Sequence, residues 1–189
     1  SMRKIRQPFS ILLVLIAVFF FQALNSCKNY DLNEEVRQSD SLISLVNQAS
    51  QTLIIENEYI RYRIDSMENK LALIASLDTN RMSDEFRNDI LKFKAILKNY
   101  KDFMITYEAL NYDNQLYKNY CQELRKKLLD HVIKKEEFEQ TYIRTKKELH
   151  DHLKKSKSLV KNLLGIENMY QRLNRKLAAF LINQNELGQ

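Results

Sequence analysis

Glycine and proline are almost missing from this chain. Its 189 residues hold 2 Gly and 1 Pro, where average usage would give about 13 and about 9. Tight turns, β-bulges and glycine-rich phosphate loops depend on these two residue types. The composition therefore excludes most β and α/β architectures, and a hydrophobic fraction of 44% argues against disorder. We expect an all-α fold in which long antiparallel helices form an extended coiled-coil hairpin or a helical bundle.

The amino-terminal segment has the layout of a secretory signal peptide. A basic head at Arg3, Lys4 and Arg6 precedes an unbroken apolar run of 11 residues, 11–21. A basic head, a short apolar run and a small residue before a junction are typical of such signals. The run is shorter than the roughly 20 apolar residues that a transmembrane helix needs. We therefore predict a signal peptide over residues 1–26.

The end of this segment resembles the lipobox of bacterial lipoproteins. Leu24 stands three residues before Cys27, and the small residue Ser26 stands directly before it. The resemblance implies that the signal peptidase recognises Leu24 and Ser26, that the Cys27 thiol receives a diacylglyceryl group, and that the chain is cut before Cys27. Asn25 departs from the small residue usual in that family. The alternative interpretation is an uncleaved short membrane anchor with an incidental cysteine at its outer end.

The residues after Cys27 bear on the location of such a lipoprotein. Lys28 stands where enteric lipoproteins that stay at the inner membrane have Asp, so the resemblance implies the outer membrane, facing the periplasm. The Ser–Cys junction in a Lys-, Asn- and Tyr-rich chain is most similar to lipoproteins of Bacteroidetes. Some of those reach the cell surface through an acidic cluster, of which Asp31, Glu34 and Glu35 are a thin version. Surface display therefore stays open as an alternative.

A heptad pattern organises the first part of the mature chain. We expect residues 27–33 to be a lipidated tether and residues 34–189 a helical bundle or coiled-coil domain, with the first helix beginning near Asn33. From residue 36, nine of 12 a and d positions are apolar, which is typical of a coiled coil. Asn57 at an a position either fixes the register of a two-stranded pairing or is an imperfect core position in a bundle. The a positions are Val36, Ile43, Ser50, Asn57, Ile64 and Leu71, and the d positions are Ser39, Val46, Leu53, Ile60, Met67 and Ile74.

A turn is predicted near 78–83, where Ser83 is positioned to cap a second helix that has two acids in its first turn. A second heptad register then runs in phase from Phe86 to Phe180, and 21 of its 28 a and d positions are apolar or aromatic. This phase favours one continuous helix from residue 84 to 164.

Two places along that helix are candidates for an interruption. The composition of 111–114, Asn-Tyr-Asp-Asn, is turn-like and favours a corner. Gly165 is the single interior glycine, so a bend or reversal is expected there. We predict continuity with kinks near both places.

Charge is unevenly distributed along the mature chain. Residues 28–117 hold 11 Lys/Arg and 15 Asp/Glu, whereas residues 118–189 hold 16 and 9. Such asymmetry permits contact with lipopolysaccharide, phospholipid headgroups or nucleic acid. An ordinary solvated helix face is the simpler interpretation, and nucleic acid is not an expected partner. The outward-facing lysines are Lys126, Lys127, Lys134, Lys147, Lys154 and Lys161.

The motifs give no sign of catalysis. His131 and His152 fall at d positions of the second register and His150 on another face, so the three do not converge on one metal ion. Glu148 shares a face with His152, but two ligands do not make a zinc site. Cys121 is expected to be a buried, small apolar residue. We expect no enzyme activity, no metal and no cofactor.

Together these patterns predict a membrane-anchored lipoprotein that acts as a helical structural or interaction module, a scaffold or spacer, in the bacterial cell envelope. Its expected partners are the membrane, through the lipid, and a protein or a second copy of the chain. Two alternatives stay open. One is a periplasmic holdase-like chaperone, and the other is an uncleaved single-pass coiled-coil subunit of an envelope complex.

Overall fold

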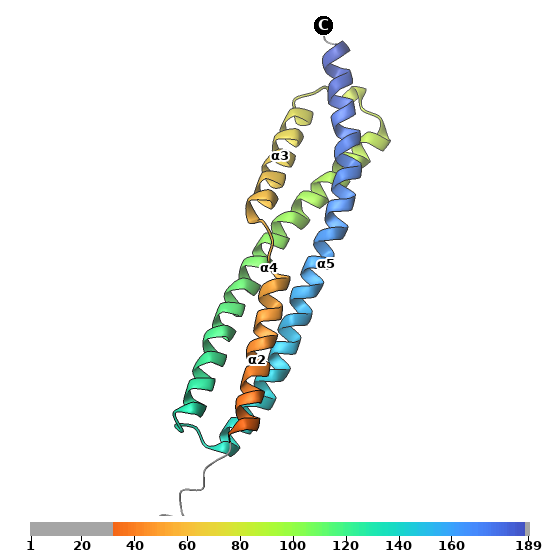
Figure 1. Ribbon diagram of the computed structural model, residues 1–189. Coiled ribbons are helices and arrows are strands. Elements are labelled where there is room, and N and C mark those ends of the chain that lie inside the picture. Colours follow the sequence, from red (N-terminus) through yellow and green to blue (C-terminus); the bar gives the residue numbers. More distant parts are fainter. Residues whose placement is uncertain (1–31, 188–189) are drawn as a thin grey trace, which may run out of the picture. The chain divides into compact units, whose positions relative to one another are not determined.

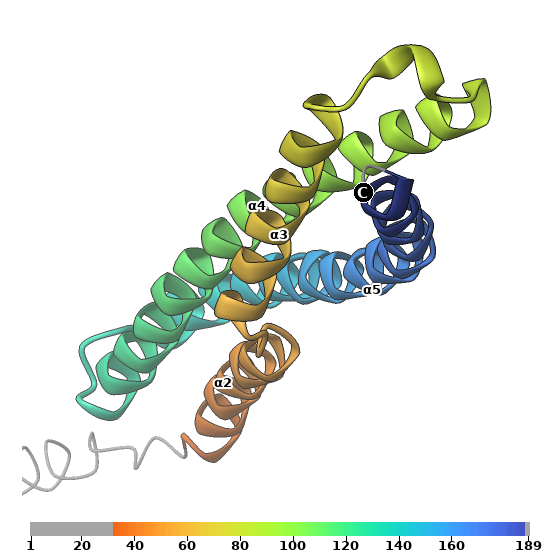
Figure 2. The same ribbon diagram turned by 90° about the horizontal axis from the view of Figure 1, so that it is seen from above.

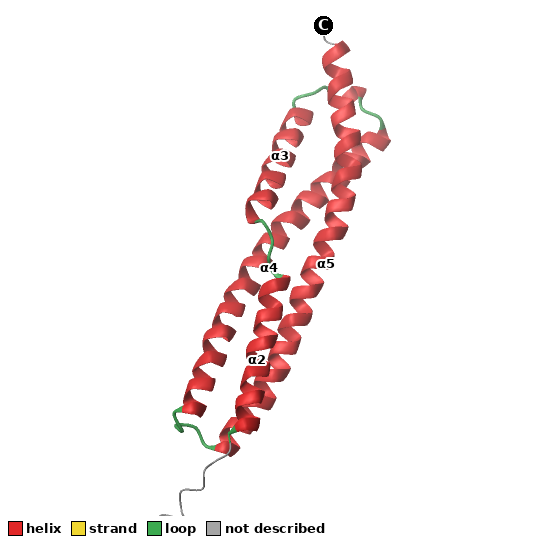
Figure 3. Cartoon of the chain, viewed as in Figure 1, coloured by secondary structure: helices red, strands yellow, loops and turns green. Residues whose placement is uncertain are grey.

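The computed structural model describes residues 32–187, and within them it is all-α, without a β-strand. Residues 36–187 belong to one compact unit. The predicted helical bundle is confirmed. Its elements are α2 (Asn33–Thr52), α3 (Asn57–Ala75), the short 3-10 helix η1 (Thr79–Arg81), α4 (Asp84–Leu129) and α5 (Lys135–Leu187) (Figures 1 and 3). No helix within residues 32–187 is both long and apolar enough to cross a membrane.

The two long helices, α4 and α5, pack side by side in opposite directions. Asp89 near the start of α4 contacts Lys176 near the end of α5. Farther along, Asn114 contacts His152. The interface between them is rich in aromatic rings, and Phe86 stacks on Phe180 with ring centroids 3.9 Å apart. Large aromatic rings bury much apolar area, and such stacking adds about 1 kcal/mol per pair.

Helices α2 and α3 together form the third helical segment of the bundle, which runs antiparallel to α4. Asp40 and Ser50 of α2 contact the carboxyl-terminal half of α4. Glu68 of α3 pairs with Lys101 in the amino-terminal half, and α3 lies along that half (Figures 1 and 2). The fold is thus a bundle of three helical segments, and the segment that comes first in the chain is divided into the two helices α2 and α3.

The d positions predicted for residues 36–74 form the innermost row of side chains along α2 and α3. All six are buried: Ser39, Val46, Leu53, Ile60, Met67 and Ile74. Within α2 the second buried row contains Leu42 and Ala49, whereas Ile43, at a predicted a position, is only half-buried. The core-facing seam of α2 therefore follows d and g positions instead of a and d.

The heptad pattern from residue 36 to 74 is that of one continuous helix, but the structure interrupts the helix at residues 53–56. Helix α2 ends at Thr52 and α3 begins at Asn57. Because the buried d row keeps its spacing of seven across the gap, the hydrophobic pattern carries no trace of it. The Tyr107 hydroxyl of α4 donates to the Leu53 carbonyl at 2.8 Å and to the Ile55 carbonyl at 3.4 Å. It thereby satisfies acceptors that the interruption removes from the helix.

The turn predicted near 78–83 and its cap are present. The 3-10 helix η1 lies in this segment, and Met82 beside it is buried. The Ser83 hydroxyl accepts a hydrogen bond from the Phe86 backbone N–H at 3.1 Å. Ser83 is therefore the N-cap of α4, as the sequence predicted.

The helix expected to run from residue 84 to 164 is instead two helices. Helix α4 ends at Leu129, the chain reverses over 130–134, and α5 begins at Lys135. The kinks expected near 111–114 and Gly165 do not interrupt either helix, since both places are helical throughout. The heptad phase persists through the reversal because the loop happens to preserve the count of seven. Of the 28 predicted core positions, His131 and Lys135, at this loop, are the exposed ones.

His131 makes the reversal in a conformation that usually requires glycine. Its φ is 54°, in the left-handed region. The backbone N–H of Val132 bonds the Lys127 carbonyl at 2.9 Å, and that of His131 bonds the Leu128 carbonyl at 3.2 Å. This is the Schellman arrangement that closes many helix ends, with glycine normally at the His131 position.

We expect His131→Gly to raise the free energy of unfolding by about 1 kcal/mol, because it relieves the left-handed strain of a residue with a Cβ. Urea unfolding followed by circular dichroism measures the change. The matched control is His150→Gly, at an exposed position inside α5, which is expected to lower stability by about 1 kcal/mol. Equal destabilisation by both variants would contradict the prediction.

Candidate functional site: a polar layer beside an open groove

A hydrogen-bonded polar layer crosses the bundle and joins α2, α4 and α5. The Asn114 amide Nδ2 donates to the Ser50 Oγ at 2.6 Å. On its other side, Asn114 Oδ1 lies 3.1 Å from His152 Nε2. Asn114 and His152 are 2% and 4% exposed. Since both side chains occupy core positions of the long helices, the layer replaces apolar packing with bonds that hold only one relative register.

The hydrogen bonds of this layer fix the tautomer of His152. Asn114 uses its amide nitrogen toward Ser50, so its oxygen faces His152 and must accept from an Nε2–H. Burial lowers the pKa of His152, Lys155 lowers it further, and Asp113 opposes both. The imidazole is therefore neutral at pH 7 and above.

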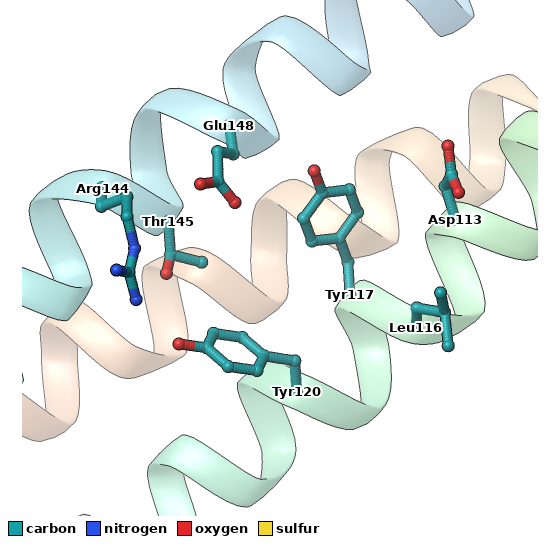
Figure 4. Close-up of a pocket in the computed structure, with 7 residues that line it drawn as sticks. All are labelled: Asp113, Leu116, Tyr117, Tyr120, Arg144, Thr145 and Glu148. Carbon is teal, nitrogen blue, oxygen red and sulfur yellow. The ribbon is translucent and has the colours of Figure 1, made fainter.

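An open groove adjoins this layer between α4 and α5. It has a volume of about 660 Å³. Figure 4 shows tyrosine rings projecting from α4 toward the side chains of α5. Tyr117 links the groove to the layer, because its ring centroid lies 5.2 Å from that of His152. The lining residues are Asp113, Leu116, Tyr117 and Tyr120 of α4 and Arg144, Thr145 and Glu148 of α5.

The groove combines apolar faces with both signs of charge. Leu116 and Tyr120 are exposed to solvent although they are large and apolar or aromatic. Burial raises the pKa of Tyr117, and the nearby carboxylates of Glu148 and Asp113 raise it further. The Tyr117 hydroxyl therefore stays protonated near neutral pH and is a hydrogen-bond donor. Such a surface suits the amphipathic side chains of a protein partner.

A second polar cluster joins α3 to α4 and α5. Arg63 of α3 and Glu167 of α5 form a two-point ion pair, with Nη2 to Oε2 at 2.8 Å and Nε to Oε1 at 3.3 Å. The hydroxyl groups of Tyr59 and Tyr100 also donate to this carboxylate. The Arg63 guanidinium lies over the Tyr170 ring, 4.0 Å from its centroid.

The environment of this cluster holds Glu167 in its charged form. Burial alone would raise the pKa of Glu167, but hydrogen bonds from Arg63 and Tyr100 lower it overall. Burial and the hydrogen bond to Glu167 raise the pKa of Tyr100. Sequence reasoning missed this pair. The available signal is its placement, since Arg63 and Glu167 occupy g and e positions, where charges flank a helical seam.

The structure describes only some of the residues predicted to carry a function. Leu24, Ser26 and Cys27 lie outside the described residues. Asn57 is the first residue of α3, and its buried Oδ1 has no hydrogen-bond partner within the described part of the chain. Cys121 is buried in the core, as expected, and burial raises the pKa of its thiol to about 11.

The three histidines lie apart. His131 is at the reversal instead of in a continuous seam, His150 is exposed, and His152 is in the polar layer. Across residues 32–187, no group of three or more His, Cys, Asp or Glu side chains is placed to hold a metal ion.

Comparison of the chain with protein-family models, curated proteins and solved structures finds no match.

Proposed function

We propose that this chain is a membrane-anchored lipoprotein whose helices serve as a structural or interaction module, a scaffold or spacer, in the bacterial cell envelope. Its lipid is carried by Cys27, its location is the outer membrane facing the periplasm, and its role is not catalytic. The support at the amino terminus is the lipobox-like run from Leu24 to Cys27 behind a short apolar segment.

The observation that carries the module role is the filled seam between α4 and α5. Core side chains fill it from Phe93 and Leu177 at one end to Leu128 and Phe138 at the other. The helices have 46 and 53 residues, which correspond to about 70 Å and about 80 Å at 1.5 Å per residue. Long helices that are packed along their length hold their two ends at a fixed distance and orientation, as a spacer must. The groove beside Tyr117 offers a place for a protein partner.

The anchoring claim predicts that Cys27 is the acylated residue. Cells that express the full chain are grown with labelled palmitate, and wild type is compared with Cys27→Ser. We expect label on wild type, no label on Cys27→Ser, and retention of the leader in that variant. Cys121→Ser is the matched control and is expected to keep the label, because Cys121 is a buried core residue.

Absence of label from the wild-type chain would overturn the lipoprotein proposal. If Cys27→Ser also stayed in the membrane at unchanged mass, the result would favour the uncleaved single-pass subunit.

A further inference from the structure

One face of α5 carries a straight row of exposed side chains that is positive in the middle and apolar at both ends. Its members follow each other at alternating intervals of four and three residues, which keeps them in line along a helix. We call it the α5 stripe. It consists of Ile143, Lys147, His150, Lys154, Lys157, Lys161 and Leu164, all exposed.

The positive charge of the α5 stripe is not neutralised within the chain. Residues 144–161 hold seven Lys/Arg and two Asp/Glu. Within residues 32–187, the four stripe lysines form no ion pair, whereas Lys98, Lys101 and Lys176 each pair with a carboxylate. One of the two acids, Glu148, lines the groove toward α4 (Figure 4). The stripe therefore lies in a segment with a net charge of 7 − 2 = +5, and its own four lysines are unpaired within the described helices.

Apolar side chains stand at both ends of this charged row. Ile143 is 68% exposed and Leu164 is 64% exposed. They are 21 positions apart in the sequence, which corresponds to about 32 Å along the helix axis. Covering such exposed aliphatic side chains with a partner surface lowers the free energy, because it removes apolar area from water.

We propose that the α5 stripe binds the anionic headgroups of a membrane surface, so that α5 lies flat along the bilayer. Lysines in a single line match a planar array of phosphates, and their flexible stems let the ammonium groups reach it. Ile143 and Leu164 then enter the boundary between headgroups and acyl chains. The stripe contains neither an arginine nor an aromatic ring, and these are the side chains that grip single-stranded nucleic acid. The inference rests on the proposed function, because the anchor is what brings the bundle to a membrane.

The test measures partition of the full chain into vesicles, with Cys27→Ser in every variant so that no lipid is attached. Vesicles of phosphatidylcholine with about 30% phosphatidylglycerol are compared with vesicles of pure phosphatidylcholine. The stripe variant replaces Lys147, Lys154, Lys157 and Lys161 by Gln. The control variant makes the same change at four exposed lysines outside the stripe that also form no ion pair within residues 32–187: Lys92, Lys94, Lys118 and Lys126. Both variants lose the same charge.

The measured quantity is the ratio of the two partition coefficients, in which the apolar leader, common to all variants, cancels. Each lysine at an anionic surface strengthens binding about fivefold, so the stripe variant is expected to lower this ratio by ~100-fold or more. The control variant is expected to change it less than about tenfold. Equal losses in the two variants, or no loss in either, would overturn the proposal. Stripe-dependent binding to a DNA duplex in place of vesicles would also overturn it, whereas failure of palmitate labelling would not alter this result.

Discussion

Replacing Glu167 by Ala is expected to lower the free energy of unfolding by about 3 kcal/mol. The Arg63 guanidinium would lose its only carboxylate partner within residues 32–187 while the bundle still covers it. Arg63 and Glu167 side chains are 15% and 17% exposed, and breaking such a pair from one side leaves an uncompensated charge that costs about 3–5 kcal/mol when fully buried. Because both side chains are still partly exposed, we expect a cost at the lower end of this range of free energies. The Tyr100 hydroxyl loses its acceptor as well.

The matched control is Glu108→Ala, which removes another ion pair of α3. Arg61 and Glu108 are 3.5 Å apart, with side chains 65% and 59% exposed, so its loss is expected to cost at most about 0.5 kcal/mol. Urea unfolding measures both variants. A double variant, Arg63→Met with Glu167→Leu, is expected to recover most of the loss, because apolar side chains of similar size leave no charge unpaired. Similar effects of the two single variants would show that the Arg63 pair is not a structural element of the core.

The all-α fold and its inner row were predictable from the sequence because they depend on local composition and periodicity. The two interruptions were not. At 53–56 and at 130–134 the spacing of core residues stays in phase, and neither segment contains glycine or proline. The chain reverses through His131 in a left-handed conformation, and the amino-acid composition of the segment does not predict this.

The candidate site was only partly predictable, for a related reason. His152 was recognisable as a polar residue in a hydrophobic seam. Its partner Asn114 belongs to a segment whose composition is turn-like, although that segment is helical and Asn114 faces the core. Arg63 and Glu167 are 104 residues apart. A heptad pattern places each of these two residues beside a hydrophobic seam, but it does not predict which helices of the bundle face each other.

Lowering the pH from about 7.5 to about 5 is expected to destabilise the fold through His152. Burial lowers the native pKa of this imidazole, whereas the unfolded chain titrates near pH 6.5. Below about pH 6.5 the unfolded state therefore binds a proton that the native state does not bind. The free energy of unfolding then falls by up to about 1.4 kcal/mol per pH unit until the native pKa is reached. Glu167 contributes in a lower window, because its lowered pKa makes stability fall only below about pH 4.5.

His152→Gln separates this effect from the other titrations. A glutamine amide keeps a donor for Asn114 Oδ1 but does not titrate, so the loss of stability between pH 6.5 and 5 is expected to flatten. His150→Gln is the control, since His150 is exposed and outside the layer, and the slope is expected to persist in that variant. Urea unfolding at several pH values provides the slopes. If the wild-type and His152→Gln slopes coincide, the neutral imidazole in the Ser50–Asn114–His152 layer is not what makes the bundle sensitive to acid.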